Sequence, residues 1–361
     1  ALIPKLTVIM EEKNPRGEDM SKAAYTAALR AKVLDCLRGL LPAGTLTNMG
    51  VFGNGRFFES LIQKLHGNNL TELQGFAKKS YEELHKVIPS FVRRAEISHR
   101  HCKALSSFQE NMQGQIKSEL KKTVDLTAKE VEAGVQLISY DPQSVEKVAA
   151  ALLFPYSEHS LADLQRHCAS LPEEELNQIL DSASMHRENR RHKSPRGLEH
   201  AVFTFEIVAD YGIYRDLQRH RMLTQERQIL SCMNGYYFPP ELKGTEMEKP
   251  YREAMEKSGD VYAEIANDLP EEAQYVVPMA YNIRWYFHAN LRALQWLCEL
   301  RSSPAGHAAY RYVAQEMASQ VSDRFPAFER FFKFVDYEGH VLGRLGQEER
   351  NEKKAESLRN L

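Results

Sequence analysis

The sequence has little that points to secretion, disulfide cross-linking or metal binding. Its 361 residues include only five cysteines, and no two of them have CxxC spacing. No apolar stretch approaches the roughly 20 residues that cross a bilayer, and the first residues lack the features of a signal peptide. None of the thirteen histidines belongs to an HExxH motif. We therefore expect a cytoplasmic protein with reduced thiols and no metal site.

A strong charge of either sign is also missing. Lys and Arg total 47 against 49 for Asp and Glu, so general binding to nucleic acid is not expected, although a local basic pocket can still form. There is no Gly-rich phosphate loop and no GxSxG nucleophile elbow. Hydrophobic residues make up 43% of the chain and charged residues 27%, which favours buried cores over disorder. The length predicts two domain-sized units.

Helical periodicity dominates what is present. Between residues 21 and 41 apolar residues recur every three or four positions, and Pro42 and Gly44 then end the helix. Similar patterns predict helices over 55–66, 70–87, 90–107, 143–152, 172–186, 245–266, 284–301, 307–323 and 325–334. Strand signals are fewer and cover 135–140, 201–209 and the short aromatic run 236–238. The mixture predicts an α+β fold in which helices cover a small sheet.

A repeat with a constant offset of 236 residues links the beginning and the end of the chain. Residues 41–56 align with residues 277–292, and residues 88–91 align with 325–328 after one inserted residue. The matched pairs are Pro42 with Pro278, Asn54 with Asn290 and Arg56 with Arg292. Two helical hairpins that share turn and capping residues by chance are one explanation, and an incomplete duplication is the other.

The duplication predicts a domain organisation. Residues 1–107 would be a partial and degenerate first copy, and residues 108–134 a polar linker rich in Gln, Lys and Glu. Residues 135–340 would be the complete copy, followed by a polar C-terminal tail over 341–361.

The most concentrated functional signal is Arg219-His220-Arg221. Two guanidinium groups beside an imidazole suit a phosphate, a pyrophosphate or an electron-rich ring. A basic cluster of three residues is more often a solvated surface. This one follows the predicted strand over 201–209, and binding residues are common where the chain leaves a regular element.

Together with other segments, this motif resembles the core of the flavin-dependent thymidylate synthases. The matching segments are His192-Lys193-Ser194-Pro195, Leu198-Glu199-His200-Ala201-Val202-Phe203-Thr204-Phe205, Arg219-His220-Arg221, Asn290-Leu291-Arg292 and Leu300-Arg301. The resemblance covers about 135–340 and, more weakly, the partial first copy. It implies an α+β fold with a small, mainly antiparallel sheet. It also implies FAD as cofactor, conversion of dUMP to dTMP with methylenetetrahydrofolate and NADPH, and active sites at the subunit interfaces of a homotetramer.

The resemblance also assigns roles to individual residues. Arg301 matches an arginine that favours ionisation of the uracil ring, because a fixed guanidinium lowers the pKa of a nearby acid. His307 is expected at the same cleft. The alternative to these functional roles is a purely structural one. Arg301 would then stabilise a helix end, and the polar residues at 194, 290 and 292 would have ordinary helix or turn roles. The flavin contacts would fall on His192, Ser194, Arg219, His220, Arg221, Asn290 and Arg292.

Four positions depart from the nucleotide-binding pattern of the family. Ile229, Ser231 and Cys232 stand where the family has Ser, Arg and Tyr, and Gln274 stands where it has another Arg. Charge-assisted contacts contribute roughly 1.5–3 kcal/mol each, so the loss of two weakens dUMP binding unless something compensates.

The first copy has the complementary pattern. Arg38 matches Gln274, whereas Leu65 matches Arg301. We therefore predict that the two copies pack as non-equivalent subunits and that Arg38 and Arg301 contribute to one composite substrate site.

Three functions remain open at this stage. The first is FAD-dependent methylation of dUMP, and the second is a flavoenzyme acting on a different pyrimidine or methyl acceptor. The third is a non-catalytic homologue that binds a flavin or a nucleotide. The expected partners are dUMP or a related nucleotide, methylenetetrahydrofolate, NADPH and further copies of the chain, without nucleic acid or membrane.

Overall fold

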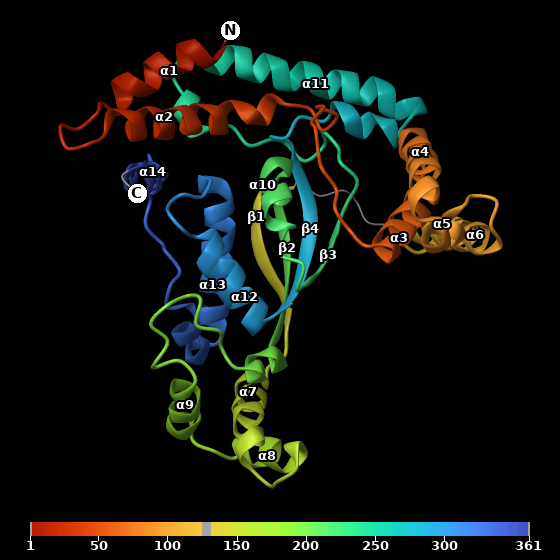
Figure 1. The fold of residues 1–361 in the computed structure, drawn as a ribbon. Helices are drawn as coiled ribbons and strands as arrows, with labels where there is room; N and C mark the ends of the chain where they lie inside the picture. Colours follow the sequence, from red (N-terminus) through yellow and green to blue (C-terminus); the bar gives the residue numbers. More distant parts are fainter. Residues whose placement is uncertain (1, 125–130, 360–361) are drawn as a thin grey trace. The chain divides into compact units, whose positions relative to one another are not determined.

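The computed structural model describes residues 2–124 and 131–359, which belong to two compact units (Figure 1). Unit 1 consists of Ala1–Ala43, Val131–Tyr262 and Val276–Leu361, and unit 2 of Gly44–Glu130 and Ala263–Tyr275. This division differs from the predicted boundaries, because residues 2–43 pack with the sheet-bearing part of the chain and residues 263–275 with the helices of unit 2.

Unit 1 is built on a four-stranded antiparallel sheet with the strand order β1-β2-β4-β3. The central strands alternate buried and more exposed residues. Phe205 lies opposite Phe287, and Ile207 opposite Trp285, with all four side chains buried. This alternation is the signature of a sheet with one face toward a core, and it confirms the predicted α+β class. The strands are β1 (Gly134–Tyr140), β2 (Val202–Asp210), β3 (Thr224–Arg227) and β4 (Asn282–Asn290).

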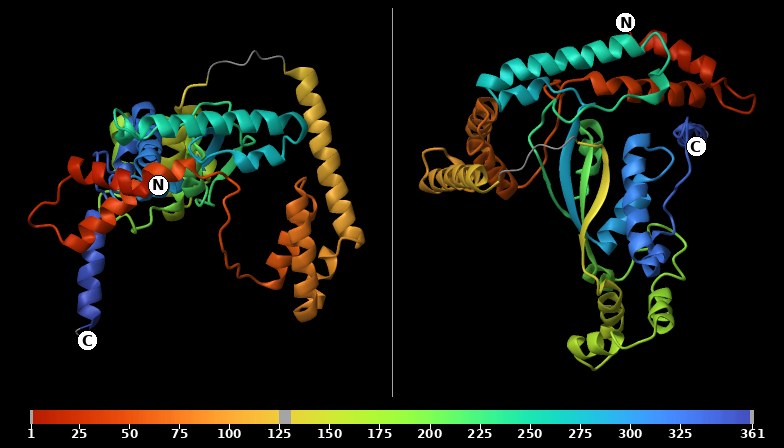
Figure 2. Two further views of the ribbon diagram at one scale, coloured as in Figure 1. Left: turned by 90° about the horizontal axis from the view of Figure 1, so that it is seen from above. Right: turned by 180° about the vertical axis from the view of Figure 1, so that it is seen from behind.

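Two helices, α12 (Leu291–Arg301) and α13 (Ala308–Arg324), lie side by side next to the sheet (Figures 1 and 2). The short α10 (Tyr211–Leu217) begins directly after β2, because the Asp210 side chain accepts a hydrogen bond from the Ile213 amide at 3.0 Å. The other helices of unit 1, with η for 3-10 helices, are α1 (Leu2–Lys13), α2 (Lys22–Leu37), η1 (Arg38–Leu40), α7 (Ser144–Leu153), η3 (Phe154–Tyr156), α8 (Leu161–Cys168), α9 (Glu173–Ser182), η4 (Arg196–His200), η5 (Pro240–Leu242), η7 (Pro326–Phe332) and α14 (Leu345–Arg359).

Unit 2 is helical, and its described residues, 44–124 and 263–275, contain no strand. A small core of Ile62, Ala77, Val92 and Ala95 holds its helices together. The elements are α3 (Gly55–His66), α4 (Thr71–Val87), α5 (Pro89–Val92), η2 (Arg93–Ala95) and the long α6 (Arg100–Thr123). The helix α11 (Glu248–Asp268) begins in unit 1 and ends in unit 2, where η6 (Glu272–Val276) follows.

Several predicted elements were wrong. The helix over 284–301 is a strand up to Asn290, because the aromatic residues of 282–290 alternate between the core and the outer face of the sheet. Tyr236 makes a single bridge with Tyr281 instead of opening a strand. The segment 325–334 is the 3-10 helix η7, which begins at Pro326.

The predicted linker and tail also contain regular structure. The helix α6 runs through the polar stretch as far as Thr123, and the helix over 90–107 is broken into α5, η2 and the start of α6. The C-terminal tail contains the charged helix α14. Within the described ranges, no helix is both long and apolar enough to cross a membrane.

Candidate functional site

A cavity of about 1170 Å³ in unit 1 brings together three segments that are far apart in the sequence. They are the loop before η4, the turn after α10, and the junction of β4 with α12. Its lining includes every residue to which the resemblance assigned a flavin contact, together with Arg301. These residues are His192, Ser194, Arg219, His220, Arg221, Asn290, Arg292 and Arg301.

The sheet explains why the segments meet. In the ladder between β2 and β4, Val202 lies opposite Asn290, so the residues just before β2 lie beside those that begin α12. Arg292 completes this junction, since its Nε donates to the Ser194 carbonyl at 2.8 Å and its Nη1 to Glu199 Oε1 at 2.9 Å. The paired ends of β2 and β4 therefore hold the loop before η4 next to the start of α12.

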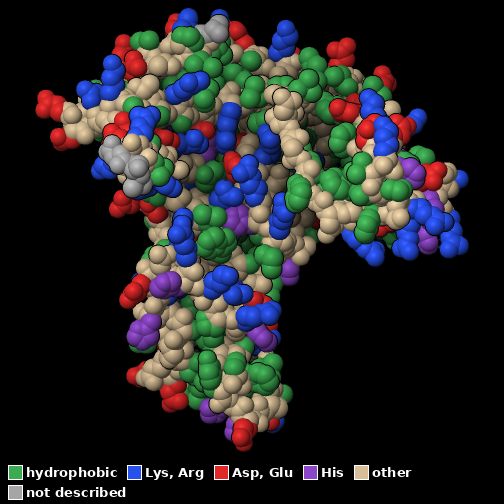
Figure 3. Space-filling model, viewed as in Figure 1, with side chains coloured by type: hydrophobic (Ala, Val, Ile, Leu, Met, Phe, Trp, Pro, Cys, Tyr) green, Lys and Arg blue, Asp and Glu red, His purple; other side chains and the backbone are tan. Residues whose placement is uncertain are grey.

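The lining carries a large excess of positive charge. Nine arginine and lysine side chains line the cavity together with a single carboxylate, that of Glu199. Arg187, Arg196, Arg219 and Arg292 have carboxylate partners. Five other cationic side chains have no carboxylate within ion-pair distance among the described residues: Arg190, Arg191, Lys193, Arg221 and Arg301. A cavity with this balance attracts anions, although the whole chain has a net charge of -2. Figure 3 shows one face of the protein, where Lys and Arg side chains lie among hydrophobic ones.

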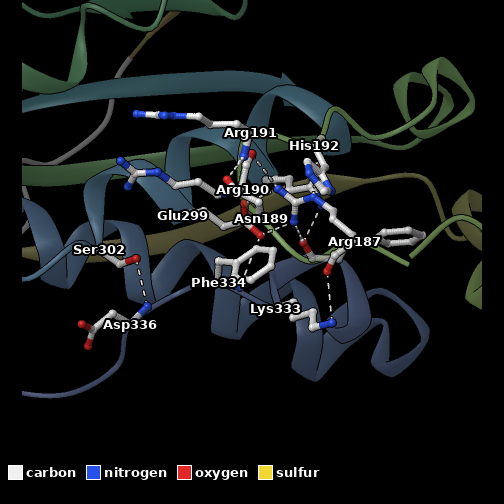
Figure 4. Close-up of polar contacts among 12 residues, drawn as sticks. Arg187, Asn189, Arg190, Arg191, His192, Glu299, Ser302, Lys333, Phe334 and Asp336 are labelled. Atoms are coloured by element: carbon white, nitrogen blue, oxygen red, sulfur yellow. Dashed lines mark hydrogen bonds and ion pairs between the residues drawn. The ribbon is translucent and has the colours of Figure 1, made fainter. Parts of the chain in front are cut away.

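Arg187 organises the loop that supplies part of this charge (Figure 4). Its guanidinium pairs with both oxygens of Glu299 at 2.5 Å, and both side chains are buried. Its Nε also donates to the His192 carbonyl at 2.9 Å, and its Nη2 to the Arg190 carbonyl at 3.0 Å. One buried guanidinium thus fixes the backbone of the cationic loop. The sequence reasoning missed both partners, because single charged residues outside a motif carry no local signal.

His220 and Arg301 form a second polar contact in the cavity. Arg301 Nε donates to His220 Nε2 at 2.9 Å. Burial and, to a smaller extent, the neighbouring positive charge of Arg301 together lower the pKa of His220 to about 4. The imidazole is therefore neutral at pH 7, which leaves Nε2 free to accept the hydrogen bond and places the ring proton on Nδ1.

Asn290 and Arg292 have structural roles whatever ligand the cavity binds. The Asn290 side chain caps α12 by accepting from the Ala293 amide at 2.9 Å. Arg292 pairs with Glu199, and the pKa of this carboxyl is lowered mainly by the Arg196 side chain and further by Arg292. Asn290 and Arg292 therefore have at least the structural roles that were considered as an alternative to ligand binding.

Ser194 supplies the observation that favours a bound group. Its side chain is 4% exposed and lines the cavity, yet the hydroxyl has no hydrogen-bond partner among the described residues. A buried hydroxyl without a partner costs roughly 1–3 kcal/mol. A phosphate oxygen would accept a hydrogen bond from this hydroxyl, so the donor set fits a phosphorylated cofactor such as a flavin nucleotide.

Two residues expected at this site lie elsewhere. Arg38 does not line the cavity and instead lies 3.6 Å from Asp216 and 3.9 Å from Asp35. His307 does not line the cavity either; it caps α13 and lines a separate small cavity with Lys32 and Asp35. Burial there lowers the pKa of His307 to about 3. The cavity lining also contains side chains that no motif had indicated, namely Arg187, Arg190, Arg191 and Trp296.

The fold and this cavity define a class of α+β protein with a cationic cavity whose charge balance suits an anionic ligand. The family model of the thymidylate synthase complementing protein matches residues 136–327, which is more than half of the chain. The chain belongs to this family.

Three relatives illustrate its relationships. A "UPF0159 protein" of Chlamydia muridarum is 54% identical over 349 residues, which are 97% of this chain and 66% of the relative. A "UPF0159 protein" of Thermoplasma acidophilum is 33% identical over 353 residues, covering 96% of this chain and 68% of the relative. A flavin-dependent thymidylate synthase of Clostridium tetani is 28% identical over 219 residues, which are 53% of this chain and 83% of that enzyme. The chain spans about two thirds of the length of the first two relatives.

Proposed function

We propose that this protein is a flavoenzyme that binds FAD in the cationic cavity of unit 1 and methylates dUMP to dTMP. Methylenetetrahydrofolate is the carbon donor and NADPH the reductant in this proposal. The observation that carries it is the convergence of the segments 192–194, 219–221 and 290–301 on one cavity. The names of distant relatives support the same reading, since three of them are flavin-dependent thymidylate synthases.

Different residues of the cavity are assigned to different parts of the ligands. We assign Arg219, Arg221 and the Ser194 hydroxyl to the diphosphate of FAD, because guanidinium groups and a hydroxyl donate to phosphate oxygens. Neutral His220 orients the guanidinium of Arg301. The remaining N–H groups of Arg301 are then available for the uracil ring, where a fixed positive charge favours the ionised form. The flavin, when bound, supplies the redox chemistry.

The exposed indole of Trp296 gives the cavity a flat apolar surface. The side chain is 42% exposed and lies in the lining with Met222 and Leu223. A tryptophan beside several cations suits a ligand that joins a planar ring to phosphate groups.

Arg38 is connected to the cavity through Asp216, which lies between Arg38 and the cavity residue Arg219. The two oxygens of Asp216 lie 3.6 Å from Arg38 and 3.7 Å from Arg219, and Arg219 lines the cavity. We propose that Arg38 assists the composite site by this route, since it does not line the cavity itself.

A different pyrimidine or methyl acceptor is the second candidate function. It is favoured by the absence of the nucleotide-binding arginines, because Ser231 and Gln274 stand at their positions. Gln274 donates to the Glu271 carbonyl at 3.1 Å, a contact within its own turn. A homologue that binds a flavin or a nucleotide without catalysis is the third outcome.

Cofactor content is the first test. The protein as isolated, or after incubation with FAD and with FMN, is expected to retain FAD through gel filtration with flavin absorbance. Binding should quench the fluorescence of Trp296 selectively, since the only other tryptophan, Trp285, is 2% exposed in the core. Failure to bind either flavin contradicts the proposal.

Turnover is the second test. The flavin-loaded protein is expected to convert dUMP to dTMP when methylenetetrahydrofolate and NADPH are added. Flavin reduction by NADPH without dTMP supports the second candidate function, and flavin binding without reduction supports the third.

A further inference from the structure

Residues 39–44 and 275–280, which belong to the two ends of the 236-residue repeat, pair with each other in antiparallel fashion. Pro42 lies opposite Pro278 in an isolated bridge. Four backbone hydrogen bonds surround this bridge: Ala43 N to Val277 O at 2.8 Å, Met279 N to Leu41 O at 2.9 Å, Gly44 N to Tyr275 O at 2.8 Å and Ala280 N to Gly39 O at 2.9 Å.

These four bonds form two pairs related by the repeat. Exchanging each residue for its partner at an offset of 236 turns the bond from Ala43 to Val277 into the bond from Met279 to Leu41. The same exchange turns the bond from Gly44 into the bond from Ala280. A contact that is unchanged when its two sides are exchanged has a local two-fold axis, which here passes between the two prolines.

The helices after the paired segments repeat as well. The helix α3 begins at Gly55 and α12 at Leu291, again 236 residues apart. Asn54 and Asn290 cap these helices in the same way, each accepting from the amide three residues later at 2.9 Å.

The second helices of the two hairpins match in length and in their ends. Both α4 and α13 have 17 residues. Their C-cap residues are Ile88 and Phe325, whose φ angles are -132° and -134°, and each of these is followed by a proline. Chance sharing of turn residues does not account for the matching start and asparagine cap of the first helices, the equal length of the second helices and the symmetric contact together.

We propose that the chain contains two copies of one structural unit and that the contact at Pro42 and Pro278 is a dimer-type two-fold contact made within a single chain. The surface around residues 275–280 thus fits the equivalent segment of the first copy. In an isologous dimer, that position belongs to the second subunit.

The positions of the prolines agree with this geometry. Opposite residues in a non-hydrogen-bonded antiparallel pair exchange no N–H···O bonds. A proline at each of these two positions therefore costs no hydrogen bond, whereas at residue 43 or 279 it would remove one of the four.

Disulfide trapping tests the contact in the full chain. In such a pair the Cα atoms lie about 4.5 Å apart, within the range of roughly 4.4–6.8 Å that a disulfide spans. The double variant Pro42→Cys/Pro278→Cys should form an internal disulfide under mild oxidation. With a protease site inserted between α6 and β1, the two fragments should stay joined without reductant and separate with it.

The matched control is Pro42→Cys/Met279→Cys, because successive side chains along an extended segment point to opposite sides. It should stay unlinked under the same conditions, as should the parent chain with its five native thiols. Disulfides between chains, or no linkage above the control, would overturn the proposal.

Two further measurements test the symmetry and guard against a variant that does not fold. The pairs Leu41→Cys/Met279→Cys and Ala43→Cys/Val277→Cys are equivalent under the two-fold axis. In a thiol redox buffer, the effective concentration of one introduced thiol for its partner should agree within about threefold between the two pairs. A difference above roughly tenfold contradicts the two-fold axis. In the unmodified chain, the amides of Ala43, Gly44, Met279 and Ala280 should all be protected from hydrogen exchange, and rapid exchange on either side would also refute the contact.

Discussion

Arg301 donates a hydrogen bond from Nε to Nε2 of His220, although 81 residues separate them in the sequence. The contact joins the end of α12 to the turn after α10, and both residues line the cationic cavity. It requires a neutral imidazole, because a protonated His220 has no acceptor to offer and would repel the guanidinium.

The first prediction concerns pH and follows from this contact. The pKa of His220 is lowered from 6.5 to about 4 in the folded protein. Between these values the unfolded chain binds a proton that the folded chain does not, so the contribution is fully present above pH 6.5 and is lost as pH falls toward 4. We expect the free energy of unfolding, measured with denaturant, to decrease over this window.

The control for this prediction is His220→Gln, which keeps an acceptor but does not titrate. His307 also has a lowered pKa, of about 3, so the wild-type slope contains its contribution as well. The difference between wild type and the variant isolates His220. If both proteins lose stability equally between pH 6.5 and 4, the assigned protonation state of His220 is wrong.

A second prediction concerns the buried pair of Arg187 and Glu299. Arg187→Met leaves the Glu299 carboxylate buried without its partner, and removing one member of such a pair typically costs about 3–5 kcal/mol. The double variant Arg187→Met/Glu299→Leu should recover most of this loss in denaturant unfolding.

Ligand binding should separate the two roles of Arg187. Even where the double variant regains stability, its FAD affinity should stay reduced, because the carbonyls of Arg190 and His192 have lost the donor that fixes the loop. Wild-type affinity in the stable double variant would show that the pair supports the fold alone.

A third prediction tests whether Arg221 of the cationic cavity contacts the flavin. Arg221→Ala should weaken FAD binding about 10- to 100-fold, which corresponds to the loss of one charge-assisted contact of roughly 1.5–3 kcal/mol. Arg227→Ala is the matched control, since Arg227 lies nearby on β3 but does not line the cavity. Equal affinities of the two variants, measured by equilibrium titration, would remove Arg221 from the site.

A fourth prediction separates the capping role of Asn290 from a role in binding. Asn290→Ala should lower the stability by about 1 kcal/mol, the usual cost of losing an N-cap, whereas Asn290→Ser should retain most of it. If the amide also contacts the flavin, the serine variant will fold normally but bind FAD more weakly. Unchanged affinity in Asn290→Ser would confine Asn290 to the cap.

A fifth prediction addresses the composite site. Arg38→Gln should weaken nucleotide binding by removing the positive charge that faces Asp216, and Arg301→Gln should weaken it from inside the cavity. Isothermal titration with dUMP in the presence of bound FAD measures both. If neither variant changes nucleotide or flavin affinity, the two arginines do not share a site.

Much of the fold could be predicted because its signals are local. The helix over residues 55–66 was predicted at the residues where it lies, since Asn54 caps an amphipathic stretch. The strand β4 could not be predicted, because Asn-Ile-Arg-Trp-Tyr-Phe-His-Ala-Asn is followed directly by a helix and its aromatic residues suit either element. Its pairing with β2 made it a strand, and that partner lies about 80 residues earlier in the chain.

The residues of the candidate site also fall into those that a local motif predicted and those that depend on distant contacts. Arg219, His220 and Arg221 were found from a short motif, and the cavity contains all three. Arg187 was missed, because its importance arises from Glu299, a residue 112 positions away. Arg38 was assigned by its place in the repeat, but its contact with Asp216 depends on where the tertiary structure places η1 and α10.

The amino-acid sequence by itself determined local features such as the helix over residues 55–66, because hydrogen bonds and sterics among neighbouring residues set it, and it contained the offset of the repeat and the cationic motif as patterns of residues. Only the tertiary structure decided which charges are paired, which hydroxyl is left without a partner and which segments share a cavity. Those outcomes depend on burial and on contacts across many residues, where the energy of a charge or a polar group is set by what packs against it.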